Sequence, residues 1–210
     1  MGSEPGLCMN GLYWEVTVLL DKKAELFRCG KELFSEKGFK ATNVAEITKR
    51  AGMATGTFYN YFVSKEKLFM EIFLKENERL KRSILDSLDL DADPMEVMGE
   101  MVSRNLQGIN ADPILKEWYN KEVFNKIEQL YREESGLDHV DFLYDCFIEV
   151  VRKWQNDGKM RGDIDAEMIM AIFAALVSID THKEEIGLQY FPQVMEYMAH
   201  FIMKGLMEDT

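Results

Sequence analysis

Residues 32–69 read ELFSEKGFKATNVAEITKRAGMATGTFYNYFVSKEKLF, a stretch in which helical segments alternate with turns that contain glycine. Asn43, with a glutamate three residues later, forms a variant capping box and predicts the start of a helix that ends at the next glycine. Residues 54–62 predict a second short helix that buries Phe58 and Phe62 one turn apart. This is the helix-turn-helix arrangement, whose second helix enters the major groove of DNA.

Longer helices flank this pair. Apolar residues at helical spacing predict an amphipathic helix over residues 19–34, and Gly38 is a plausible left-handed stop after it. Ser64 is positioned to cap a long helix whose apolar stripe runs over residues 68–84. A helix-turn-helix pair framed by longer helices is therefore expected in the first part of the chain.

The remainder of the chain is also helical by pattern. Two Asp-Pro pairs, at residues 93–94 and 112–113, each place a capping side chain before a first-turn proline. Further helices are predicted over 139–156 after the break at Gly136, over the almost wholly apolar segment 168–179, and from Pro192 onward. No strand pattern competes, so the predicted fold class is all-α.

Composition narrows the function classes. The chain has 210 residues, a formal net charge of −12 and 47% hydrophobic residues, which excludes a disordered chain. No apolar run reaches the roughly 18 residues of a membrane helix, and no basic leader precedes residue 20. The three cysteines, Cys8, Cys29 and Cys146, fit neither a disulfide framework nor a zinc site. We therefore expect a cytoplasmic protein without membrane partner, metal, cofactor or catalytic centre.

Charge is divided unevenly along the chain. Residues 1–82 carry 14 basic and 11 acidic side chains, whereas residues 83–210 carry 11 and 26. Residues 37–67 hold six basic and two acidic side chains. A basic segment in an acidic chain suggests nucleic-acid contact through that segment, although such a local excess also arises by chance.

The outward side of the second short helix has side chains suited to DNA. Once Phe58 and Phe62 are buried, hydroxyl, amide and small side chains are left to approach base edges, and Tyr59 and Lys65 can reach the DNA backbone. The predicted groove-facing residues are Ala54, Thr55, Thr57, Asn60 and Tyr61. A helical hairpin with solvated polar faces is the alternative interpretation.

This stretch closely resembles the DNA-binding domain of the tetracycline-repressor (TetR) family. The motifs are LFxxKGFxAT, an isoleucine, and AGxxxGTxYxYFxSKExL, with glycines and aromatics in register over residues 17–75. The resemblance implies that Thr42 and Asn43 cap a helix and touch phosphate. It implies that Thr55, Gly56, Thr57 and Asn60 meet base edges, and that Tyr59, Tyr61 and Lys65 contact phosphates.

The sequence also departs from the family pattern. Val63 replaces a frequent proline, Ala45 an arginine that often helps, and Thr55 a common lysine. Fewer cations at the groove leave an alternative open, in which the chain is a helical dimeric interaction protein that kept the fold but lost operator binding.

The resemblance implies an organisation for the whole chain: an extension over 1–16, a three-helix DNA-binding domain over 17–65, and an all-helical ligand-binding and dimerisation domain over 66–210. It implies a homodimer that binds a palindromic double-stranded DNA operator, represses transcription and is released by a small-molecule effector.

Methionine and aromatic side chains suggest where a partly apolar effector binds, since such residues line adaptable pockets. Ordinary core packing is the alternative for each of them. The candidate ligand-binding residues are Met98, Met101, Trp118, Tyr119, Phe124, Tyr144, Phe147 and Trp154. An all-α enzyme using Glu117 and Glu122 is a third possibility that rests only on their nearness in the sequence.

Overall fold

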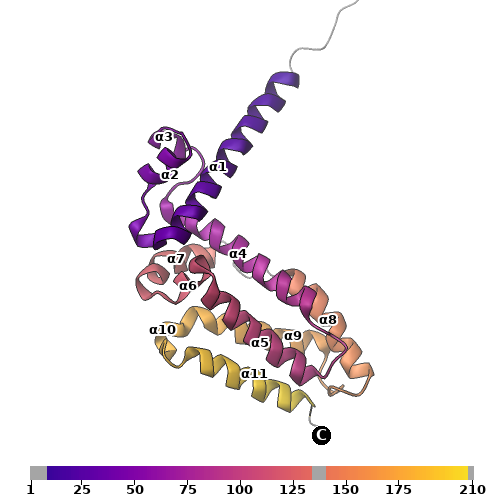
Figure 1. Cartoon of the computed structure of the whole chain (residues 1–210). Coiled ribbons are helices and arrows are strands. Elements are labelled where there is room, and N and C mark those ends of the chain that lie inside the picture. Colours follow the sequence, from indigo (N-terminus) through magenta and orange to yellow (C-terminus); the bar gives the residue numbers. More distant parts are fainter. Residues whose placement is uncertain (1–8, 134–140, 208–210) are drawn as a thin grey trace, which may run out of the picture. The chain divides into compact units, whose positions relative to one another are not determined.

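A computed structural model describes residues 9–133 and 141–207, and every regular element in these ranges is helical (Figure 1). The predicted all-α fold is confirmed. The α-helices are α1 (Met9–Ala41), α2 (Val44–Arg50), α3 (Thr55–Phe58), α4 (Lys65–Ser87), α5 (Pro94–Ala111), α6 (Pro113–Lys116), α7 (Lys121–Glu133), α8 (Asp141–Asn156), α9 (Ala166–Ser178), α10 (Lys183–Ile186) and α11 (Phe191–Met207). Short 3₁₀ helices follow α6 (Glu117–Tyr119) and α9 (Ile179–His182).

The chain forms two compact units that separate between Ile72 and Phe73, inside α4. The functional division predicted between residues 65 and 66 stays a prediction, because compactness does not report which residues bind DNA or ligand.

Phenylalanines form the core of the first unit. Phe34 and Phe39 both pack edge-on against Phe69 of α4, with ring centroids 5.1 and 4.9 Å apart. Helices α1 and α4 approach closely at Gly30, where a Cβ atom would lie 2.7 Å from a methyl carbon of Leu68. Helices α2 and α3 are too short to be stable as isolated helices, so they depend on packing of α2 against α1 and of α3 against α2.

In the second unit the two helix starts predicted from the Asp-Pro pairs are confirmed. Asp93 accepts hydrogen bonds from the backbone N–H groups of Met95 and Glu96, and Pro94 occupies the first turn of α5. Asp112 caps α6 in the same way, with Pro113 in the first turn. Each aspartate satisfies N–H groups that the helix itself leaves without partners.

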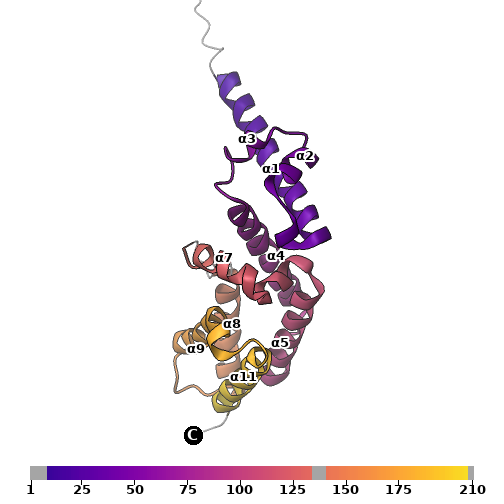
Figure 2. The ribbon, with the colours of Figure 1, turned by 90° about the vertical axis from the view of Figure 1, so that its left-hand side faces the viewer.

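Helix α5 packs against α11, and α8 packs against α9 (Figure 2). Trp154 of α8 is fully buried, and its indole N–H donates to the Leu90 carbonyl at 3.3 Å. The surrounding core contains Val97, Met98, Phe147, Ile148, Val151, Met160, Ala166, Ile169, Met170, Met203 and Leu206.

Several element boundaries differ from the predictions. Helix α1 begins at Met9, ten residues before the predicted start and within the expected extension. Helix α3 ends at Phe58, and its segment continues as a turn in which Asn60 N–H donates to Thr57 and Tyr61 N–H to Phe58. The predicted break at Gly136 lies outside the described residues.

Gly38 interrupts the helical backbone inside α1, near its C-terminal end, with φ 79° and ψ 170°, a conformation almost confined to glycine. We expect Gly38→Ala to lower the free energy of unfolding by about 1–3 kcal/mol, because a Cβ strains this backbone. Thermal and denaturant unfolding measure the change.

Gly99→Ala is the matched control, since a Cβ at this helical position meets no atom within 4 Å. It should leave stability unchanged or raise it by up to about 1 kcal/mol through helix propensity. Equal stabilities of the two variants would contradict the strain at Gly38.

Candidate nucleic-acid interface and effector cavity

Helix α2 begins with the predicted capping box. The Asn43 side chain accepts from Glu46 N–H at 3.0 Å, and the Glu46 carboxylate accepts from Asn43 N–H at 3.3 Å. At the other end Gly52 has φ 67°, and Met53 N–H donates to the Thr48 carbonyl at 2.8 Å. Both ends of α2 are therefore held by local bonds, so the turn into α3 has a defined path.

The α3 segment is anchored by two rings. Phe58 and Phe62 are buried, with ring centroids 5.6 Å apart. The residues around them face solvent: Tyr59 is 58% exposed, Asn60 is exposed, and Tyr61 is half-buried. Ala54, Thr55 and Gly56 are exposed at the start of the segment, and Thr57 is half-buried. Together with Asn43, this accessible set gathers eight of the ten predicted DNA-binding residues, and we call it the reading surface.

Gly56 is a glycine that the fold does not require. A Cβ there would meet no protein atom within 4 Å, and the position lies inside α3. A larger residue would favour the helix. Glycine at an exposed helix start instead lets another molecule's backbone approach closely, as DNA would do.

Two of the side chains predicted to contact phosphate, Thr42 and Lys65, are engaged inside the first unit. Thr42 is buried, and its hydroxyl lies within hydrogen-bonding distance of the Gly38 and Leu33 carbonyls, at 2.9 and 3.2 Å. The Lys65 ammonium donates to the Phe39 and Thr42 carbonyls, both at 2.9 Å, and lies 4.1 Å from the centre of the Phe39 ring. Both side chains hold the turn between α1 and α2 from inside.

Arg50 and Lys37, two further cations of the first unit, are paired with carboxylates. Arg50 binds Glu36 through two hydrogen bonds of 2.7 and 2.8 Å, which hold the pKa of Glu36 below its usual value. Lys37 binds Glu46 at 2.7 Å and lowers the pKa of that carboxyl. Phosphate would have to compete with these carboxylates.

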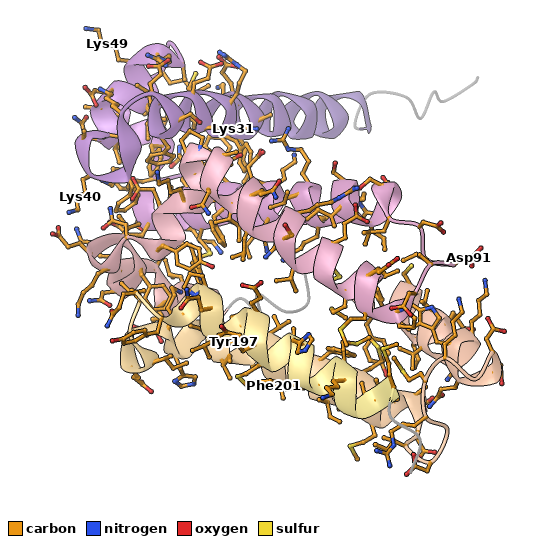
Figure 3. All side chains as sticks on the ribbon, turned by 60° about the horizontal axis from the view of Figure 1, so that its bottom comes forward. Lys31, Lys40, Lys49, Asp91, Tyr197 and Phe201 are labelled. Atoms are coloured by element: carbon orange, nitrogen blue, oxygen red, sulfur yellow. The ribbon has the colours of Figure 1, made fainter. Side chains whose placement is uncertain are left out.

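Lys40 and Lys49 are exposed and project from the ribbon of the first unit (Figure 3). Neither was among the predicted contacts. Their signal in the sequence was the local excess of basic residues, which does not show which of these cations are exposed.

The second unit contains a cavity of about 860 Å³ between α5 and α11. It is lined by Met95, Met98, Gly99, Val102, Ser103, Leu106, Gln107, Asn110 and Ala111 of α5, and by Glu196, Tyr197, Ala199, His200 and Met203 of α11. We call it the α5–α11 cavity. Its volume lies within the range of small-molecule sites.

Of the predicted ligand-binding residues, only Met98 lines the α5–α11 cavity. Met101 and Phe147 line a separate small cavity, Trp154 is buried, and Tyr144 is partly exposed on α8. Sequence reasoning missed the α11 wall and the polar residues Ser103, Gln107 and Asn110, although their helical spacing is visible in the sequence.

The remaining three candidates surround a buried lysine. The Lys183 ammonium lies 3.4 Å from the ring centre of Phe124, 3.9 Å from that of Trp118 and 5.8 Å from that of Tyr119. These faces interact favourably with a cation. The chain's own lysine therefore occupies the space that these aromatic residues enclose.

Helices α9 and α11 expose apolar side chains. Met168 and Val177 of α9 are exposed. Tyr197 and Phe201 of α11, which are labelled in Figure 3, are also exposed. The Tyr197 and Phe201 rings stack at 6.1 Å, one turn apart. Exposed apolar side chains on two helices are typical of a protein interface.

The first unit is similar to a known protein family. Residues 24–72 match the family model described as "Bacterial regulatory proteins, tetR family". The chain is similar to the HTH-type transcriptional repressor KstR2 of Mycolicibacterium smegmatis, with 22% identity over 191 residues, 83% of this chain and 89% of the relative.

Solved structures share the fold. RolR in complex with the ligand resorcinol has a TM-score of 0.65 and 17% identity, covering 91% of this chain and 90% of that one. FadR from Bacillus subtilis in complex with stearoyl-CoA has a TM-score of 0.54 and 16% identity, covering 87% and 98%.

In the described ranges, no helix is long and apolar enough to cross a membrane, and no three His, Cys, Asp or Glu side chains are grouped as metal ligands.

Substitutions of Lys65 and of Lys49 should have different effects on stability and on the salt dependence of binding to double-stranded DNA. Lys65→Met removes the bonds to two carbonyls, so it should lower stability by about 1–3 kcal/mol. It should weaken DNA binding without changing the salt slope. Lys49→Met should leave stability unchanged and reduce the slope of log K against log salt by about 0.9 if one phosphate contact is lost.

A reduced salt slope in Lys65→Met at unchanged stability would show that Lys65 contacts phosphate and that its internal bonds do not persist on DNA.

Proposed function

We propose that the chain is a ligand-responsive DNA-binding transcriptional regulator of the tetR family, a repressor that binds a palindromic operator as a homodimer and leaves it when a small molecule binds. The family consists of regulators rather than enzymes, so the carboxylates Glu117 and Glu122 carry no catalytic role. We place its action in the cytoplasm, where operator DNA is found.

The observation that carries this proposal is the reading surface. Its side chains are threonine and tyrosine hydroxyls, two exposed amides and small groups, and all of them except Asn43 stand on a segment that the buried rings of Phe58 and Phe62 hold in place. Such groups hydrogen-bond to phosphates and to base edges. At Gly56 there is open space where a side chain would fit, so the packing of the protein does not explain the glycine.

The exposed residues of α9 and α11 support the homodimer. Phe201 is 66% exposed and Tyr197 is 61% exposed, which is costly for aromatic side chains on a single copy. A second copy related by a two-fold axis would cover them with the same surface. Two-fold symmetry in the protein implies two-fold symmetry in the operator.

Gly56→Ala tests the reading surface. The added methyl group should weaken binding to the operator by about tenfold or more, because it meets the DNA instead of the protein. Fluorescence anisotropy with labelled fragments of the chain's own upstream region measures the affinity, and thermal unfolding should show equal or higher stability.

Gly162→Ala is the control, since this exposed glycine of the second unit also has open space at its Cβ position. It should leave DNA binding unchanged. If the unmodified chain shows no sequence-specific, salt-sensitive binding, the interaction-protein alternative, which the carboxylate-paired Arg50 and Lys37 favour, replaces this proposal.

Phe201→Glu tests the homodimer. A carboxylate in the covered apolar surface should move the chain from dimer to monomer in sedimentation experiments, because burying an unpaired charge is strongly unfavourable. Val63→Glu is the matched control on the first unit, where Val63 is 80% exposed, and it should remain dimeric. A Phe201→Glu dimer of unchanged affinity would place the interface elsewhere.

A further inference from the structure

We propose that the α5–α11 cavity selects a neutral, largely apolar molecule carrying hydroxyl or carbonyl groups, and that it discriminates against an anionic group inside the cavity. The proposal rests on the proposed function, because it assigns the chemical class of the effector. It is carried by the side chains that line the cavity.

The walls are mainly apolar. Met98, Val102 and Leu106 of α5 face the same space as Ala199 and Met203 of α11. Apolar walls of this extent favour a ligand whose body buries hydrocarbon surface. Methionine side chains adapt to irregular shapes, so these walls can accommodate apolar ligands of different shapes.

On α5, the polar side chains that line the cavity lie along one edge of the helix. Ser103, Gln107 and Asn110 recur at helical spacing, so they line one side of the helix. Gln107 donates one amide N–H to the Ser103 hydroxyl at 3.1 Å, and Asn110 donates one to the Leu106 carbonyl at 2.9 Å. Each amide retains a carbonyl oxygen and a second N–H, which match hydroxyl or carbonyl groups of a neutral ligand.

Charge decides against an anion. None of the described residues that line the cavity is lysine or arginine, and Glu196 adds a carboxylate to the α11 wall, one turn from His200. An anion would lose its hydration and approach a like charge without gaining an arginine or lysine partner. A neutral molecule bears neither cost.

Two fluorescent probes separate these classes. Phenylnaphthylamine is neutral, and anilinonaphthalene sulfonate has the same rings with one sulfonate added. Both are titrated with the full chain. We expect the dissociation constant of the neutral probe to be at least about tenfold lower than that of the sulfonate probe. Burying the sulfonate without a partner and placing it near a carboxylate each cost more free energy than a tenfold ratio represents.

Gly99→Trp assigns the signal to the cavity. A Cβ at Gly99 meets no atom within 4 Å, so the indole extends into the cavity while the helix gains propensity. Binding of the neutral probe should be lost, with thermal unfolding showing that the variant is folded. Gly162→Trp places the same side chain outside the cavity and should leave probe binding unchanged.

Glu196→Lys tests the charge argument. It should strengthen sulfonate binding by about tenfold or more, since an ammonium replaces a carboxylate at the wall. The control is Glu149→Lys on α8, whose carboxylate pairs with Arg152 away from the lining residues, and it should have no such effect.

Equal or tighter binding of the sulfonate to the unmodified chain would overturn the neutral class. Unchanged binding of the neutral probe in a folded Gly99→Trp variant would overturn the location. Operator binding without any probe is measured separately. Failure there removes the proposed function, whereas the probe ratios test only the chemistry of the cavity.

Discussion

The reading surface depends on the burial of Phe58 and Phe62. Because these rings lie one turn apart and point into the first unit, the residues between and before them must face outward. Helix α3 itself spans only Thr55–Phe58, a length at which helix formation alone contributes little. Its position therefore comes from hydrophobic burial and from the hydrogen-bonded turn that follows α2.

A second constraint lies beneath that surface. Lys65 and Thr42 saturate backbone carbonyls around the turn that ends at Asn43, so two residues suited to phosphate contact are used to build the first unit. Arg50 and Lys37 are paired with carboxylates as well. Close approach and hydrogen bonding consequently have a larger share in DNA binding than the number of basic residues implies.

The parts of the fold that the sequence predicted are those with local causes. The Asn43 cap and the Asp-Pro helix starts depend on residues at most three positions apart, so a pattern shows them. The end of α3 is not visible in a local pattern, because the apolar spacing continues through Phe62 whether the backbone there is a helix or a turn. The surroundings of most of the aromatic candidate ligand-binding residues could not be predicted from local sequence patterns either. The rings of Trp118 and Phe124 contact the Lys183 ammonium, and the sequence does not predict this contact because Lys183 lies far from both residues along the chain.

Helix α11 connects the two proposed roles of the second unit. Ala199 and Met203 line the cavity, whereas Phe201 is exposed on the surface assigned to the dimer, and Tyr197 belongs to both. A ligand in the cavity therefore contacts the helix on which dimer geometry is proposed to depend. It can shift that geometry only by binding one arrangement more tightly than another. A preference of about 1–3 kcal/mol, typical of coupling between sites, corresponds to a change of roughly 5–150-fold in operator affinity. Rearranged packing along a single helix is sufficient to supply a preference of that size.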